Sequence, residues 1–295
     1  MKKIQYRNII LLFLTAFIWG SGFVAQSSGS NYAQPFTFGF VRCILGALVL
    51  FVFIKITDRR KPQGKDLSDD KKTLIVGGIS CGVVLCIAMS LQQIGIEHTT
   101  VGKGGFITAL YIILVPILGI FLKKRVGIQV WSSVALAAVG LYFLCITESV
   151  SIQTGDLYML VCAIFFSVHI LVIDYFSPKV DGVKMSCLQF FVCAILSGIM
   201  MLIFETPDVQ SLLAGWFPIL YAGVLSCGIA YTLQIVGQKG ADPTIASLIL
   251  STEAVVSVLL GFLILHEKLT LRELLGCILM FGAIILAQLP GRNKS

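Results

Sequence analysis

Three formally charged side chains interrupt long apolar stretches of the sequence, namely Arg42, Lys103 and Glu253. An unpaired charge at the centre of a bilayer costs at least about 2.5–3.5 kcal/mol, so such residues are expected to face a partner or a water-filled cavity. With a helical rise of about 1.5 Å per residue, Arg42 lies roughly 9 Å below one surface and Glu253 roughly 15 Å deep. Lys103 lies near the end of its run, where its long side chain can reach water.

Two kinds of chemistry are open to Glu253. It could exchange a proton while a cavity alternates between the two sides of a membrane, because burial favours the neutral form of a carboxylate. It could instead be a fixed structural partner of Arg42 or Lys103, and we favour this interpretation because a nearby base keeps a carboxylate charged. Arg42 likewise has two possible roles, which are to anchor helices and to bind a substrate carboxylate.

Uncharged polar residues recur at the spacing of one helical face. Because a lipid-facing amide is costly, such faces should line either a helix interface or a water-filled cavity. The stripes are Thr15, Trp19, Gly22 and Gln26, then Tyr231, Gln234 and Gln238, then Thr244, Ser247 and Ser251, with a patch of Met89, Gln92 and Gln93. One stripe alone is more typical of helix packing. Together with the charges, the candidates for a substrate cavity are Trp19, Arg42, Gln92, Lys103, Tyr231, Gln234, Ser251 and Glu253.

Residues that bind metals or nucleotides do not cluster in the sequence. The nine cysteines form no Cys-x-x-Cys pair and the three histidines lie far apart, whereas zinc and iron–sulfur sites need clustered ligands. The phosphate-binding Gly-x-x-x-x-Gly-Lys-Ser/Thr motif is absent, and His266-Glu267 lacks the second histidine of a zinc protease. We therefore expect no metal, no other cofactor and no enzymatic activity, and we interpret the cysteines as small packing residues.

The composition of the chain is that of a membrane protein. Of its 295 residues, 57% are hydrophobic and 13% are charged, against about 45–50% and about 25% in soluble domains. These proportions exclude a soluble enzyme, a DNA-binding module and a secreted disulfide scaffold. The bilayer is the expected partner, and no nucleic acid is expected.

Ten apolar runs of helical length are the elements that must position these side chains. They lack the period-2 alternation of a membrane barrel, and a backbone in lipid must satisfy its own hydrogen bonds. The sequence therefore predicts an all-α polytopic membrane protein with ten transmembrane helices. The runs are approximately 8–27, 36–56, 73–95, 100–122, 127–147, 155–176, 184–204, 214–236, 243–265 and 271–289.

The distribution of basic residues predicts the orientation. Of the twenty-two Lys and Arg residues, eighteen fall at the termini or in the loops on the same side, and two fall in the opposite loops. Cytoplasmic loops are enriched in Lys and Arg. Both termini should therefore face the cytoplasm of a cell membrane, which we expect to be a bacterial cytoplasmic membrane, and topology accounts for the net charge of +7.

Two segments of the chain, 100–144 and 244–286, echo each other at an offset of about 142 residues. We interpret residues 1–149 and 150–295 as two five-helix repeats within one membrane unit. Five spans per half is an odd number, so the second repeat would enter the membrane from the other side. Inverted repeats of this kind are a recurring basis of alternating access.

The layout resembles the drug/metabolite transporter superfamily, in its EamA-type ten-helix branch, over essentially the whole chain. Members often have Glu-Pro where this chain has Glu253-Ala254, and Leu-Gly-Glu where it has Leu265-His266-Glu267; the first-half counterpart of that second glutamate is replaced by Lys123-Lys124-Arg125. These departures bear on the substrate rather than on the fold. The resemblance is carried by Trp19-Gly20-Ser21-Gly22-Phe23, Arg42, Ser251-Thr252-Glu253-Ala254-Val255, Leu265-His266-Glu267-Lys268-Leu269, Gly276 and Gly282.

The resemblance implies a secondary transporter, working as an exporter of small polar metabolites such as amino acids. We expect alternating access around a central cavity, with a small-molecule substrate and coupling to protons as one option. A membrane-embedded enzyme and a non-transporting membrane scaffold are the alternatives. The sequence leaves the substrate, the coupling ion and the oligomeric state open.

Overall fold

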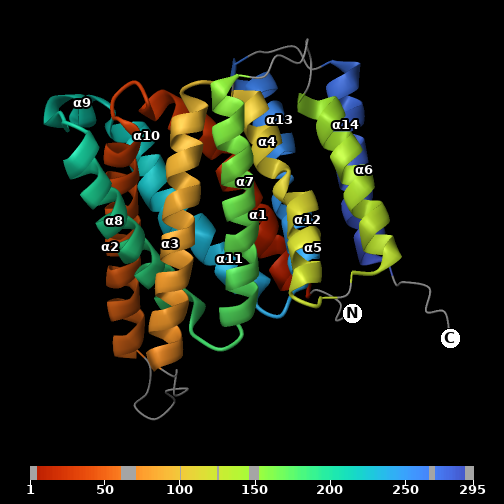
Figure 1. Ribbon diagram of the computed structural model, residues 1–295, viewed down its shortest axis with the longest axis horizontal. Helices are drawn as coiled ribbons and strands as arrows, with labels where there is room; N and C mark the ends of the chain where they lie inside the picture. Colours follow the sequence, from red (N-terminus) through yellow and green to blue (C-terminus); the bar gives the residue numbers. More distant parts are fainter. Residues whose placement is uncertain are drawn as a thin grey trace.

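The computed structural model describes residues 5–60, 71–99, 101–124, 126–145, 153–265 and 270–289. Within these ranges every regular element is a helix, and no strand occurs (Figure 1). This is the structure expected for apolar segments whose backbone groups must pair with each other. The first half contains α1 (Tyr6–Gly29), α2 (Pro35–Arg60), α3 (Lys71–Ile96), α4 (Val101–Ala109), α5 (Tyr111–Phe121) and α6 (Ile128–Cys145).

The second half is divided into more segments than the first. Its third span is made of α10, a π-helical segment η1 and α11 in succession. The elements are α7 (Thr154–Phe176), α8 (Gly182–Phe204), α9 (Val209–Ala214), α10 (Trp216–Leu220), η1 (Tyr221–Ala230), α11 (Tyr231–Gln238), α12 (Pro243–Leu250), α13 (Glu253–Leu265) and α14 (Leu271–Gln288).

Eight spans in the described ranges are long and apolar enough to cross a membrane. Two shorter apolar helices, Ile128–Phe143 and Leu274–Ala287, occupy the positions of the fifth and tenth predicted runs. The chain is therefore a multi-pass membrane protein. The total of ten spans stays a prediction.

Two of the predicted runs are broken near their middle. The run 100–122 divides at Leu110 into α4 and α5, and the run 243–265 divides at Ser251 and Thr252 into α12 and α13. The hydroxyls of Ser251 and Thr252 donate to the carbonyls of Leu248 and Ile249, at 2.8 and 2.6 Å. Side-chain bonds of this kind compete with the helical ladder, which explains why the second break occurs at these residues.

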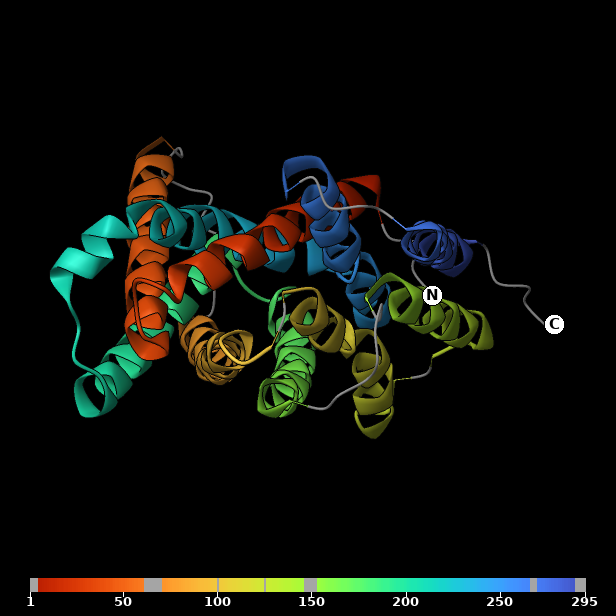
Figure 2. The same cartoon turned by 90° about the horizontal axis from the view of Figure 1, so that it is seen from above.

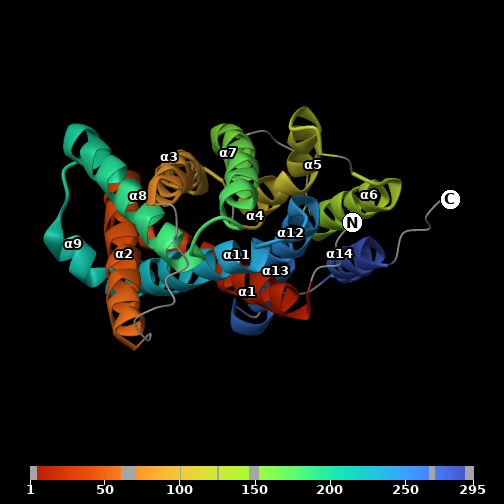
Figure 3. The ribbon, with the colours of Figure 1, turned by 90° about the horizontal axis from the view of Figure 1, so that it is seen from below.

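Helix packing is preserved when the two halves are exchanged. If each helix is replaced by its counterpart in the other half, the pair α3 and α8 becomes the pair η1 and α2. Both pairs are in contact. Likewise the contact between α7 and α3 has its counterpart in the contact of α1 with η1 and α11. The last helices of the halves, α6 and α14, pair with each other at one end of the elongated molecule, away from the α2–α8 pair (Figures 2 and 3).

Two glycines allow helices to approach closely. A Cβ added at Gly20 in α1 would lie 2.5 Å from the carbonyl oxygen of Glu253 and 2.7 Å from Cβ of Val256. A Cβ at Gly140 in α6 would lie 3.0 Å from the carbonyl oxygen of Gly276 in α14. Small residues at these crossings let membrane helices pack backbone to backbone, so α1 is held directly against the start of α13.

Candidate functional site

A narrow cavity with a volume of about 30 Å³ lies inside the bundle. Its walls come from both halves: α1, α2, α3, α4 and α5 of the first half, and α7, η1, α11 and α13 of the second. α1 runs through the middle of the molecule (Figure 2). The lining residues are Trp19, Phe23, Gln26, Arg42, Gln92, Thr108, Tyr111, Phe166, Ser226, Tyr231 and Glu253.

Arg42 is held in this cavity by neutral groups. Its side chain is 3% exposed, with Nη1 donating to Gln26 Oε1 at 3.1 Å and Nη2 donating to the carbonyl of Met89 at 3.3 Å. The guanidinium also lies over the ring of Phe38, 5.3 Å from its centroid. Nε of Arg42 makes no hydrogen bond to any described residue. The guanidinium is thus oriented by neutral groups of α1 and α3.

Glu253 is the acidic counterpart, at the first residue of α13. Its Oε1 accepts a hydrogen bond from the hydroxyl of Tyr111 at 3.0 Å, and the positive end of the α13 dipole favours a carboxylate at this position. No ion pair within the described part of the chain joins Glu253 to Arg42. The favoured interpretation, a structural pair of Glu253 with Arg42 or Lys103, is not seen for Arg42, because the guanidinium is engaged by α1 and α3 and a phenol supplies the donor. For Lys103 it stays a prediction. The side chain of Lys103 lies outside the described residues.

Trp19 and Tyr231 form an aromatic wall. Their ring centroids are 4.5 Å apart with a tilt of 56°. The Nε1–H of Trp19 is buried and has no acceptor among the residues described. Tyr231 also packs edge-on against Phe190 and His169, with centroids 5.5 and 6.0 Å away. Tyr231 therefore lies between the cavity and the side chains of Phe190 and His169, which do not line it.

The structure brings five of the eight sequence candidates together around the cavity: Trp19, Arg42, Gln92, Tyr231 and Glu253. Two others are buried but do not line it. Gln234 lies one turn beyond Tyr231, and Ser251 bonds to the carbonyl of Leu248 at the break between α12 and α13.

Sequence reasoning missed Tyr111, which sits in an apolar run with no polar stripe. One signal could have found it. Tyr111 precedes Glu253 by 142 residues, which is the offset of the predicted internal repeat, so the two residues would occupy corresponding positions of its halves. Both begin the second segment of a broken span.

An all-helical bundle that crosses the membrane many times around a buried polar cavity is the architecture of a membrane transporter. The EamA-like transporter family model matches the chain twice, over residues 7–146 and 153–289. The chain belongs to the EamA-like transporter family and is a membrane transporter.

Curated relatives agree with this assignment. An uncharacterized transporter of Archaeoglobus fulgidus is 30% identical over 279 residues, which is 94% of this chain and 84% of the relative. The uncharacterized transporter YoaV of Bacillus subtilis is 23% identical over 278 residues, covering 91% of this chain and 92% of the relative. A crystal structure with a TM-score of 0.76 and 19% identity covers 96% of both chains and shows that the fold is shared.

Proposed function

We propose that this chain is a secondary transporter that exports small polar metabolites, such as amino acids, by alternating access around the cavity. The observation that carries the proposal is a pair of opposite charges, Arg42 and Glu253, that line one cavity while each is held by neutral groups among the described residues. Buried charges in a membrane are costly and mark substrate or ion pathways. Export, rather than uptake, follows the resemblance of the sequence to known exporters.

The internal repeat supports alternating access. The family model matches each half separately, and helix packing keeps its pattern when the halves are exchanged. Tyr111 and Glu253 meet although they occupy corresponding positions, as expected for residues near a pseudo-two-fold axis. We propose two inverted repeats, 1–149 and 150–295, that exchange conformations to open the cavity on alternate sides.

Proton coupling through Glu253 completes the proposal. A carboxylate whose described partner is a neutral phenol can lose and regain a proton without breaking an ion pair, and a buried site favours the neutral form. Substrate would then leave the cell in exchange for protons that enter through the same cavity.

Purified protein in liposomes, tested with a panel of labelled small metabolites, would test this function. We expect saturable exchange of at least one polar metabolite and its accumulation when a pH gradient is imposed. Glu253→Gln should keep exchange and lose gradient-driven accumulation. The matched control is Glu97→Gln, which neutralises an exposed carboxylate beyond the end of α3 and should leave both activities intact. A Glu253→Gln protein that accumulates substrate like the wild type would refute the coupling.

A further inference from the structure

A second group of buried polar side chains lies beneath Tyr231, outside the cavity. We call it the lower polar layer: His169 on α7, Gln189 on α8, and Gln234 and Gln238 on α11. Each of the four is at most 1% exposed. His169 Nε2 and Gln189 Oε1 lie 3.1 Å apart, and the ring of His169 packs edge-on against Tyr231. The layer thus continues the polar interior of the protein past the aromatic wall.

Three amide atoms in this layer have no hydrogen-bond partner among the described residues: Gln189 Nε2, Gln234 Oε1 and Gln238 Oε1. Most buried polar groups in proteins are paired, and each exception asks for an explanation. Glutamines that serve only to hold helices together would be expected to use both ends of the amide. Three unused amide atoms in one layer instead indicate groups that find their partners in another conformation.

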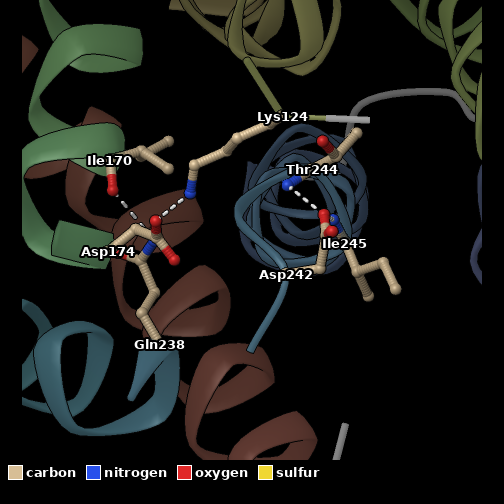
Figure 4. Close-up of polar contacts among 7 residues, drawn as sticks. All are labelled: Lys124, Ile170, Asp174, Gln238, Asp242, Thr244 and Ile245. Carbon is tan, nitrogen blue, oxygen red and sulfur yellow. Dashed lines mark hydrogen bonds and ion pairs between the residues drawn. The ribbon is translucent and has the colours of Figure 1, made fainter. Parts of the chain in front are cut away.

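The layer ends at a contact between the two halves. Lys124, which follows α5, forms an ion pair with Asp174 of α7 (Figure 4). One turn earlier on α7, the carbonyl of Ile170 accepts a hydrogen bond from Nε2 of Gln238 at 3.4 Å (Figure 4). The side chains of Lys124 and Asp174 are 34% and 19% exposed. The ion pair thus joins the two halves at a partly exposed position, and the buried hydrogen bond joins α7 to α11 next to it.

We propose that the lower polar layer is the second leg of the transport pathway, closed in this structure, and that the Lys124–Asp174 ion pair and the Gln238–Ile170 hydrogen bond are its latch. This inference rests on the alternating access proposed above. When the latch opens, the amide donor of Gln189 and the amide acceptors of Gln234 and Gln238 meet water and a polar solute that carries both donors and acceptors. Neutral amides bind such a solute weakly enough to release it, which transport requires.

Cysteine accessibility tests the inference in a protein whose native cysteines have been replaced. Gln234→Cys and Gln238→Cys report on the layer, and Ile235→Cys is the matched control because Ile235 is equally buried but packs in an apolar cluster. A small charged thiol reagent should label the two glutamine positions about tenfold faster than the control, since labelling follows the population of the open form. Equal rates at the glutamine positions and at Ile235, whether fast or slow, would overturn the inference.

Opening the latch provides a second readout. Asp174→Asn removes the ion pair and should raise labelling of Gln234→Cys at least about twofold, as expected for a partly exposed pair, with no change at Ile235→Cys. Lys124→Gln breaks the same pair from the other half and should do the same if Asp174→Asn does not fold. Labelling that neither variant changes would show that the ion pair is no latch.

These measurements need no substrate, so they separate the inference from the proposed function. An accessible layer in a protein that moves no metabolite would leave the pathway standing and reject the transport proposal. A protein that transports a metabolite while Gln234→Cys and Gln238→Cys stay as protected as Ile235→Cys would support the transport proposal and reject the pathway through the layer.

Discussion

At the scale of single residues, dipoles solvate the two buried charges within the part of the chain that the structure describes. Arg42 donates to an amide oxygen and a carbonyl, and Glu253 accepts from a phenol. A charge held by neutral groups can bind a counter-charge on a ligand directly. An internal ion pair would first have to be broken, which leaves a buried charge without its partner. The cavity is therefore lined by one basic and one acidic group.

Tyr111→Phe tests the contribution of the phenol. The substitution keeps the ring that fills the wall of the cavity and removes the donor to Glu253. A hydrogen bond to a charged group contributes about 1.5–3 kcal/mol, so we expect a lower melting temperature and transport that falls by about tenfold or more. The measurement is initial transport rate together with the melting temperature in detergent. A wild-type rate in Tyr111→Phe would show that the bond has no part in transport.

Arg42→Lys tests the geometry of the basic group. Lysine keeps the positive charge but cannot donate to both Gln26 and the carbonyl of Met89 from a planar fork. We expect the substrate concentration for half-maximal transport to rise about tenfold, the equivalent of about 1.4 kcal/mol, with a normal elution profile in size-exclusion chromatography. An unchanged half-maximal concentration would assign Arg42 to helix packing instead.

At the scale of elements, the breaks within spans place the site. α5 begins at Tyr111 and α13 begins at Glu253, so each break puts a polar side chain at the start of a new helical segment. The positive end of a half-helix in the middle of a membrane favours anionic groups, as in other transporters with discontinuous helices. The contact of α1 with α13 at Gly20 fixes one of these segments in place.

Gly20→Ala should disrupt that contact. The new methyl group would collide with the carbonyl of Glu253 and with Val256, and overpacking costs about 1–3 kcal/mol. The matched control is Gly282→Ala in α14, where an added Cβ meets nothing within 4 Å and where alanine favours the helix by roughly 0.5–1 kcal/mol. We expect a lower melting temperature for the first variant and an equal or higher one for the second. Equal melting temperatures below the wild type would mean that helical glycines matter for another reason.

The sequence predicted the helical elements well but could not predict their breaks. Continuous apolar runs predict helix. The segment around Leu110 is as apolar as the rest of its run, and Ser251, Thr252 and Glu253 are each compatible with a helix. The breaks depend on hydroxyl-to-carbonyl bonds and on tertiary contacts, which periodicity does not report. The polar stripes predicted that Trp19 and Tyr231 line the cavity, and they do. Tyr111 and Phe166 belong to no stripe, so only the folded chain shows that they line it.

At the scale of the whole molecule, the distribution of charge and the repeat make one connected prediction. Eighteen of the basic residues lie on the side assigned to both termini, and an even number of spans follows if each half contributes five. The connection between α8 and α9 lies at the opposite edge of the bundle from the lower ends of α2 and α3 (Figure 1).

Reporter fusions test that topology. Fusions within residues 61–70 and after residue 289 should report a cytoplasmic location, because Lys and Arg are retained on that side. A fusion between Glu205 and Asp208 should report the external side. An external reading at the carboxyl-terminal fusion would require an odd number of spans, and the inverted repeat would then have to be abandoned.

The pairing of α6 with α14 has a consequence for how the protein is made. α6 packs most extensively against a helix that starts more than a hundred residues later in the chain. At about 5–20 residues per second of synthesis, roughly 6–25 s separate the two helices. During that interval the face of α6 around Gly140 is exposed to lipid, because its partner helix α14 has not yet been synthesised. Loss of the last helix to a premature stop would make that waiting state permanent and expose it to membrane proteases.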